Sequence, residues 1–255
     1  MSTRRKVVIA TVAVMAVAFG LWALARIAGL SESTQATNPV IRWEYLFSRE
    51  RTRGELWSRA REHIELTVVP VVLGTIISAV LAALVLRFRK LQGLVFTFAG
   101  LLYTIPSLAL FGVLVTYNTN WTAAVIALTS YTLLIVTRNM VAGIESVPSA
   151  VVDAADGLGM SRWQRLLKVE LPLALPIILT GIRVATVTTV GLVGISAVIQ
   201  LGGLAYYIFD GFRRDFTTLI VIGSGFSILL AITLDLMLRG VERLTTPWNA
   251  KGALR

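Results

Sequence analysis

Long runs of uncharged, mostly apolar residues limit most strongly how this 255-residue chain can fold. The runs lie at 7–25, 66–86, 91–137, 184–209 and 216–234. A membrane-spanning helix needs about 20 apolar residues, and the third run is long enough for two helices. Turn-forming residues at 117–120 would divide it. The sequence therefore predicts an all-α integral membrane protein with six spans.

The basic residues predict which way these helices cross the membrane. We place the spans near 7–28, 64–86, 91–116, 121–138, 176–200 and 216–239. If Arg4, Arg5 and Lys6 are cytoplasmic and the spans alternate, most of the 24 basic residues fall on the cytoplasmic side, together with both termini. The net charge of +10 then reflects topology in a lipid bilayer and argues against nucleic-acid binding. The first run is longer than a usual signal-peptide core, which favours a retained anchor over a cleaved leader.

A polar loop at 139–175 interrupts the apolar pattern and is cytoplasmic by the charge argument. Pro148 disfavours helix before it, and Ser149 is a candidate N-cap for a short helix over 149–156. Gly157 and Gly159 can stop that helix and permit a sharp turn. The loop therefore begins with a short helix that ends at a glycine turn.

A second amphipathic helix is predicted over 161–170. Ser161 and Gln164 have the spacing of a capping box. Leu171-Pro172 is expected to end this helix, and Pro176 is expected to begin the next span. The second helix would brace the first one against the membrane.

The first helix of the loop presents small and acidic side chains, which suit close docking in a groove of another protein. Its candidate docking residues are Ser149, Ala150, Asp153, Ala154, Ala155, Asp156, Gly157 and Gly159. The alternative is a solvated connector in which alanine and glycine serve only folding.

The ordered set of Asp153-Ala154-Ala155, Gly157 and Leu171-Pro172 resembles the EAA loop of ABC-importer permeases. Further stretches resemble the permeases for glycine betaine, choline, carnitine and related osmoprotectants: His63–Thr67, Thr104–Leu110, Gly181–Arg183 and Ile199–Leu204. The resemblance covers about residues 60–245. The chain departs from the family pattern at Asp153, where glutamate is usual, at Asp156, where a basic or small residue is common, and at Gln200, where glycine is usual.

The resemblance implies a five-span permease core with one extra N-terminal helix. The expected divisions are an anchor at 1–28, an extracytoplasmic linker with an amphipathic interfacial helix at 29–62, the core at 63–245 and a cytoplasmic tail at 246–255. It also implies import of a small osmoprotectant by alternating access, with no catalytic residues, metal or cofactor in this chain. ATP and Mg would belong to a pair of ATP-binding subunits, with an extracytoplasmic binding protein and a second permease copy as the other partners.

Two alternatives to osmoprotectant import stay open. The first is an importer permease for methionine or another amino acid. The second is a stand-alone channel or ion-coupled carrier, which would need acidic groups within the membrane; only Asp235 qualifies. The chain has no GxxxxGK[ST] pattern, so no ATP site of its own is predicted.

Candidate pathway residues are grouped in three places. Pro106 should kink the third helix near the hydroxyls of Tyr103, Thr104 and Ser107. The outer turn contributes Gln200, Gly202 and Gly203, and Arg183 either reaches the cytoplasmic surface or pairs with Asp235. Helix packing is the alternative role for the small and hydroxyl residues. His63, the single histidine, is expected to be a satisfied interfacial residue rather than a metal ligand.

Overall fold

The computed structural model describes residues 50–246, and every regular element in that range is a helix. The predicted all-α class is confirmed for these residues. The predicted first span at 7–28, the linker before residue 50 and the tail beyond residue 246 lie outside the described residues.

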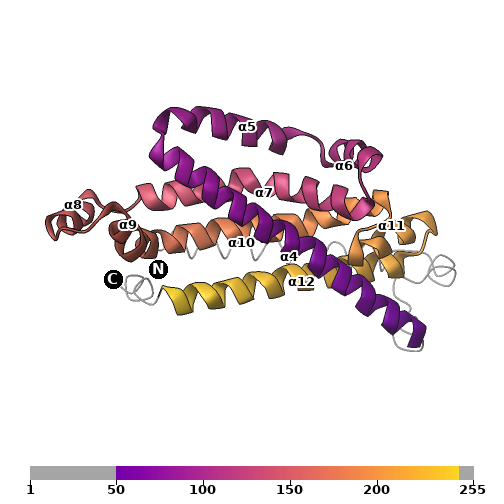
Figure 1. The fold of residues 1–255 in the computed structure, drawn as a ribbon. Coiled ribbons are helices and arrows are strands. Elements are labelled where there is room, and N and C mark those ends of the chain that lie inside the picture. The colour runs from indigo at the N-terminus through magenta and orange to yellow at the C-terminus, as the bar shows by residue number, and fades with distance from the viewer. Residues whose placement is uncertain (1–49, 247–255) are drawn as a thin grey trace, which may run out of the picture.

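Four long helices form the body of the molecule: α4 (Glu50–Arg87), α7 (Asn120–Glu145), α10 (Leu171–Ile195) and α12 (Thr217–Thr245). All four are long and apolar enough to cross a membrane. α7 packs between α4 and α10, α10 packs against α12, and α4 crosses the other helices diagonally (Figure 1). Fully buried side chains such as Leu66, Leu128, Val136 and Val193 fill the space between them.

The predicted kink of the third span at Pro106 is confirmed, and it is a complete break between two helices. α5 (Gln92–Thr104) and α6 (Ser107–Tyr117) meet at a bend of 91° at Ile105-Pro106. Proline lacks an N–H and disfavours helical geometry in the residue before it, so the helix breaks. The Tyr131 hydroxyl donates to the Ile105 carbonyl at 2.7 Å and satisfies a backbone group that the break leaves free. The described chain therefore has four helices that are long and apolar enough to span a membrane, or five such segments if this bent pair is counted as one.

α4 begins earlier than its predicted start at residue 64. The helix is continuous from Glu50 to Arg87. The described part of the predicted interfacial helix and the predicted second span are therefore one helix. Ion pairs Arg59–Glu62 at 3.1 Å and Arg61–Glu65 at 2.7 Å lie along its polar first half. Pairs at these spacings support a helix in which apolar packing is sparse.

The polar loop also differs from its prediction at its far end. α8 (Ser149–Gly157) is followed by α9 (Arg162–Arg165) and by the π-helical turn η2 (Leu166–Glu170), which runs directly into α10. The predicted helix end at Leu171-Pro172 and the predicted span start at Pro176 are therefore wrong. The widened turn precedes Pro172, whose ring would otherwise meet the carbonyl of Lys168.

Short elements complete the chain between the long helices. η1 (Arg89–Leu91) joins α4 to α5, and η3 (Ser196–Ile199), η4 (Gly203–Ala205) and α11 (Tyr206–Arg213) join α10 to α12. α11 lies at the opposite end of the bundle from α8 and α9 (Figure 1). One end of the bundle therefore carries α8 and α9, and the other end carries α11.

Candidate functional site

α8 lies at one end of the bundle, beyond the spanning helices (Figure 1). Ala155 is its buried residue, while Asp153, Ala154 and Gly157 are exposed. The carboxylate of Asp153 has no partner among residues 50–246. The predicted N-cap is wrong, because Pro148 occupies the cap position and Ser149 is the first helical residue. α8 thus offers a small exposed surface with one free acidic group.

The two glycines after this helix differ in their backbone geometry. Gly159 has φ +74°, a left-handed conformation that favours glycine. Gly157 is helical, and no described atom lies within 4 Å of where its Cβ would be. Nothing described within the chain therefore requires glycine at 157, although glycine weakens a helix.

Large apolar side chains near α8 are exposed, and Leu158 among them was not predicted from the sequence as a site residue. Leu158 is 78% exposed and Trp163 is 73% exposed, and Val151 on α8 is also exposed. Leu158 lies in the turn between Gly157 and Gly159, where no helical periodicity indicates which way a side chain faces. The only sign of an exposed apolar group in the sequence was a leucine between two glycines. Exposed apolar groups on a rigid projection mark a surface suited to a protein partner or lipid.

The predicted capping box at the start of α9 is confirmed. The Ser161 N–H donates to Gln164 Oε1 at 2.9 Å, and the Gln164 N–H donates to Ser161 Oγ at 3.3 Å. The following Arg165 bonds both oxygens of Asp156 in α8, at 2.7 and 2.6 Å, and Glu170 Oε1 at 2.6 Å. Asp156, a predicted docking residue, is therefore already engaged inside the chain.

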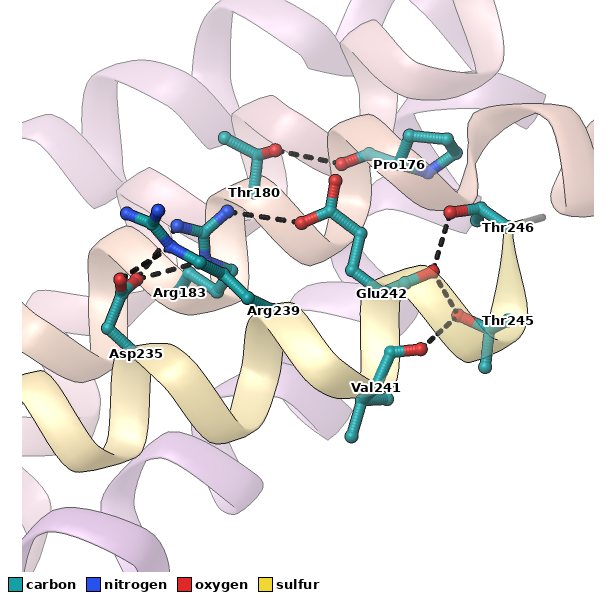
Figure 2. A network of polar contacts seen from close by, with 9 residues as sticks. All are labelled: Pro176, Thr180, Arg183, Asp235, Arg239, Val241, Glu242, Thr245 and Thr246. Carbon is teal, nitrogen blue, oxygen red and sulfur yellow. Dashed lines mark hydrogen bonds and ion pairs between the residues drawn. The ribbon is translucent and has the colours of Figure 1, made fainter. Parts of the chain in front are cut away.

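A second charged cluster joins α10 to α12 (Figure 2). Arg183 donates to Asp235 Oδ1 from Nε at 3.0 Å and from Nη2 at 2.9 Å, as the sequence analysis proposed. Arg183 Nη1 also donates to Glu242 at 3.1 Å, and Arg239 pairs with Asp235 at 2.8 Å. The Arg183, Asp235 and Glu242 side chains are only 18–22% exposed. Each charge has therefore lost most of its contact with water, and the ion pairs compensate for that loss.

An open cavity of about 580 Å³ adjoins this cluster between α10 and α12. Arg183, Asp235 and Arg239 line its charged end, and Val184 and Leu236 are among the apolar residues that line the rest. Arg183 therefore borders a cavity as well as holding two helices together.

The other predicted pathway residues lie at two separate places. Tyr103, Thr104 and Pro106 are exposed at the α5–α6 break, where the Tyr103 ring meets Tyr131 edge to face at 6.1 Å. Thr104 Oγ1 donates to the Leu101 carbonyl at 2.8 Å, and Ser107 is half-buried at the start of α6.

The outer turn between η3 and η4 contains three left-handed residues. Gln200, Gly202 and Gly203 have φ values of 65°, 108° and 51°. A Cβ on Gly203 would lie 2.5–2.7 Å from His63 atoms, so the turn rests directly on α4. The geometry explains the two glycines through packing, and Gln200 adopts a left-handed backbone that glycine would adopt more easily.

His63 is fully buried beneath this turn. Its Nε2 lies 3.1 Å from the Val190 carbonyl, and Nδ1 has no partner among the described residues. His63 therefore connects α4, α10 and the outer turn, and the predicted satisfied residue is only half satisfied.

Substitutions in this turn should separate backbone strain from sequence preference. Gly203→Ala is expected to destabilise the protein by about 2 kcal/mol, because alanine would be left-handed and would overlap the His63 backbone. Gln200→Gly is the matched control and is expected not to lower stability, since glycine relieves its left-handed conformation. Thermal unfolding of both variants in detergent measures the difference; equal unfolding temperatures would contradict the packing interpretation.

The described helices define an α-helical membrane protein that carries a rigid polar loop at one end. Residues 74–246 match the family described as "Binding-protein-dependent transport system inner membrane component". The match spans most of the described chain. The chain therefore belongs to this family of inner-membrane transport components.

Two named relatives and one solved structure are similar to this chain over most of its length. The chain is 38% identical over 200 residues to the osmoprotectant import permease protein OsmW of Salmonella typhimurium, covering 76% of this chain and 93% of the relative. It is 34% identical to the glycine betaine/carnitine/choline transport system permease protein OpuCB of Bacillus subtilis, covering 78% and 92%. A solved structure of the MetNI methionine ABC transporter, in an inward-facing conformation, shares the fold with a TM-score of 0.69 at 19% identity, covering 78% of this chain and 99% of that one.

Proposed function

We propose that this chain is the membrane permease subunit of an ABC importer for a small osmoprotectant such as glycine betaine, carnitine or choline. The observation that carries the proposal is its similarity to osmoprotectant permeases over almost their whole length. The similarity to the methionine transporter supports the fold alone, because the identity is 19%. Import of methionine or another amino acid stays the alternative that the uptake experiment tests.

The loop supports a subunit that is driven by a partner. α8 is short, exposed and rigidly held, which suits insertion into a groove on an ATP-binding subunit. ATP and Mg would be bound by a pair of such subunits. A binding protein would deliver the solute at the opposite end, and a second permease copy would complete the pathway. Asp153, Ala154, Gly157 and Leu158 are the residues that we assign to the docking surface.

Uptake into proteoliposomes tests this function. With its cognate ATP-binding subunit and binding protein, the permease is expected to accumulate labelled glycine betaine, carnitine or choline only when ATP is supplied. Excess methionine should not compete if the osmoprotectant assignment is correct. Uptake by the permease alone without ATP would support a channel or carrier, and methionine uptake would support import of an amino acid.

A further inference from the structure

The Arg165 cluster, defined as Asp156, Arg165 and Glu170, connects α8 to the helix that follows it. Arg165 binds both oxygens of Asp156 and one oxygen of Glu170, all at 2.6–2.7 Å. Nη1 donates to both Asp156 oxygens and Nε donates to Glu170, so the planar guanidinium bridges the two carboxylates through charge-assisted hydrogen bonds. Within the described chain, this is the ion-paired link between α8 and η2.

The π-helical turn brings Glu170 to Arg165. In an α-helix, residues five apart point about 140° away from each other. In η2 the Leu171 N–H bonds the Leu166 carbonyl, five residues back, so residues at this spacing lie on the same side. The irregular turn therefore makes a three-residue charge cluster possible where a regular helix would separate its members.

The backbone between α8 and α9 is short and contains a left-handed glycine, Gly159. α8 packs against α9 and η2, and the helical segment from Arg162 to Ile199 continues into the membrane without a sharp break. A displacement of α8 can reach α10 only if the turn between them does not absorb it. The Arg165 cluster spans that turn.

Stability alone is a weak explanation for the contact between Arg165 and Asp156. The Asp156 side chain is 50% exposed, and ion pairs with an exposed member contribute little to folding. The Arg165–Glu170 pair is more buried, with side chains 23% and 13% exposed, and it lies within the segment that follows α8.

We propose that Arg165 is a positioning residue that holds α8 at a fixed angle to α10, so that movement of α8 is passed to the membrane span. The proposal rests on the proposed function, because it takes α8 as the helix on which the ATP-binding subunit acts. Asp156 faces Arg165 in this arrangement, which leaves Asp153 as the acidic group available to the partner.

The test uses the complete transporter in proteoliposomes, and it measures solute moved per ATP hydrolysed. Arg165→Gln is expected to lower this ratio about fivefold, while the ATP-binding subunit still co-purifies and still hydrolyses ATP. Arg162→Gln is the matched control, since Arg162 is exposed and forms no ion pair with the described residues. It should leave the ratio unchanged.

Reversing the charges separates a positioning role from a general loss of structure. In Asp156→Arg with Arg165→Asp, the arginine at position 156 faces the aspartate at position 165, so the ion pair across the turn forms again with its charges reversed, and we expect at least half of the lost ratio to return. The proposal is overturned if Arg165→Gln behaves like Arg162→Gln, if the ATP-binding subunit is lost, or if hydrolysis and transport fall in proportion. Absence of ATP-dependent uptake by the unaltered complex would instead reject the proposed function, and the Arg165 role with it.

Discussion

Replacing Gly157 with tryptophan is expected to abolish ATP-dependent uptake while the protein still inserts into the membrane. Gly157 is exposed at the end of α8, its backbone is helical, and the described chain leaves room for a larger side chain. The chain itself should therefore tolerate tryptophan. A partner groove that receives α8 would not, because an interface core is packed as closely as a protein interior.

Two further variants make this result specific. Gly157→Ala should stabilise α8 by about 0.5–1 kcal/mol, since alanine is the better helix former, and should retain most uptake. Lys168→Trp places the same bulk at an exposed position of η2, outside the residues assigned to docking, and should also transport. Co-purification of the ATP-binding subunit reports docking directly. Normal uptake by Gly157→Trp would remove α8 from the docking surface.

The sequence predicted the helices well because apolar length is a direct requirement of the bilayer. It also predicted the Ser161–Gln164 capping box, because that motif depends on two residues at a strict spacing. The Arg183–Asp235 pair was one of two arrangements that the sequence left open, and the structure has the pair. These features are local, or they follow from the high cost of an isolated charge in the membrane.

Proline was the main source of error, because its effect depends on what surrounds it. Pro106 breaks a helix completely, whereas Pro176 lies inside α10. Neighbouring helices and hydroxyl groups can satisfy backbone groups that proline leaves free, and tertiary packing decides whether they do so. The sequence alone does not distinguish the two positions.

Only part of the candidate site could be predicted from the sequence, because contacts between helices decide which side chains stay free. Asp156 was predicted to face a partner, but the π-helical turn places Glu170 and Arg165 where they engage it. Nothing in the residue pattern predicts that turn. Glu242, by contrast, could have been found: it lies seven residues after Asp235, on the same face of α12, and so could also reach Arg183.

Reversing the charge of Arg183 is expected to cause the largest loss of folded, active protein. Arg183→Glu would place three carboxylates together, at positions 183, 235 and 242, in a cluster that is about one-fifth exposed. Removing one partner of a buried ion pair costs on the order of 3 kcal/mol, and repulsion adds to it. The yield of monodisperse protein in detergent and the uptake activity should both fall sharply. Asp235→Asn is milder, because Arg183 keeps Glu242.

Restoring the opposite sign at position 235 should recover only part of this loss. In Arg183→Glu with Asp235→Arg, the new pair forms between α10 and α12. However, the introduced arginine stands one turn from Arg239, and the introduced glutamate stays near Glu242. Adding Glu242→Gln removes the second repulsion and should raise yield and uptake further. This order of recovery follows from a network of four residues, whereas a simple pair would recover fully in the double variant. If neither the double nor the triple variant improves on Arg183→Glu, the charges do not stabilise the contact between α10 and α12.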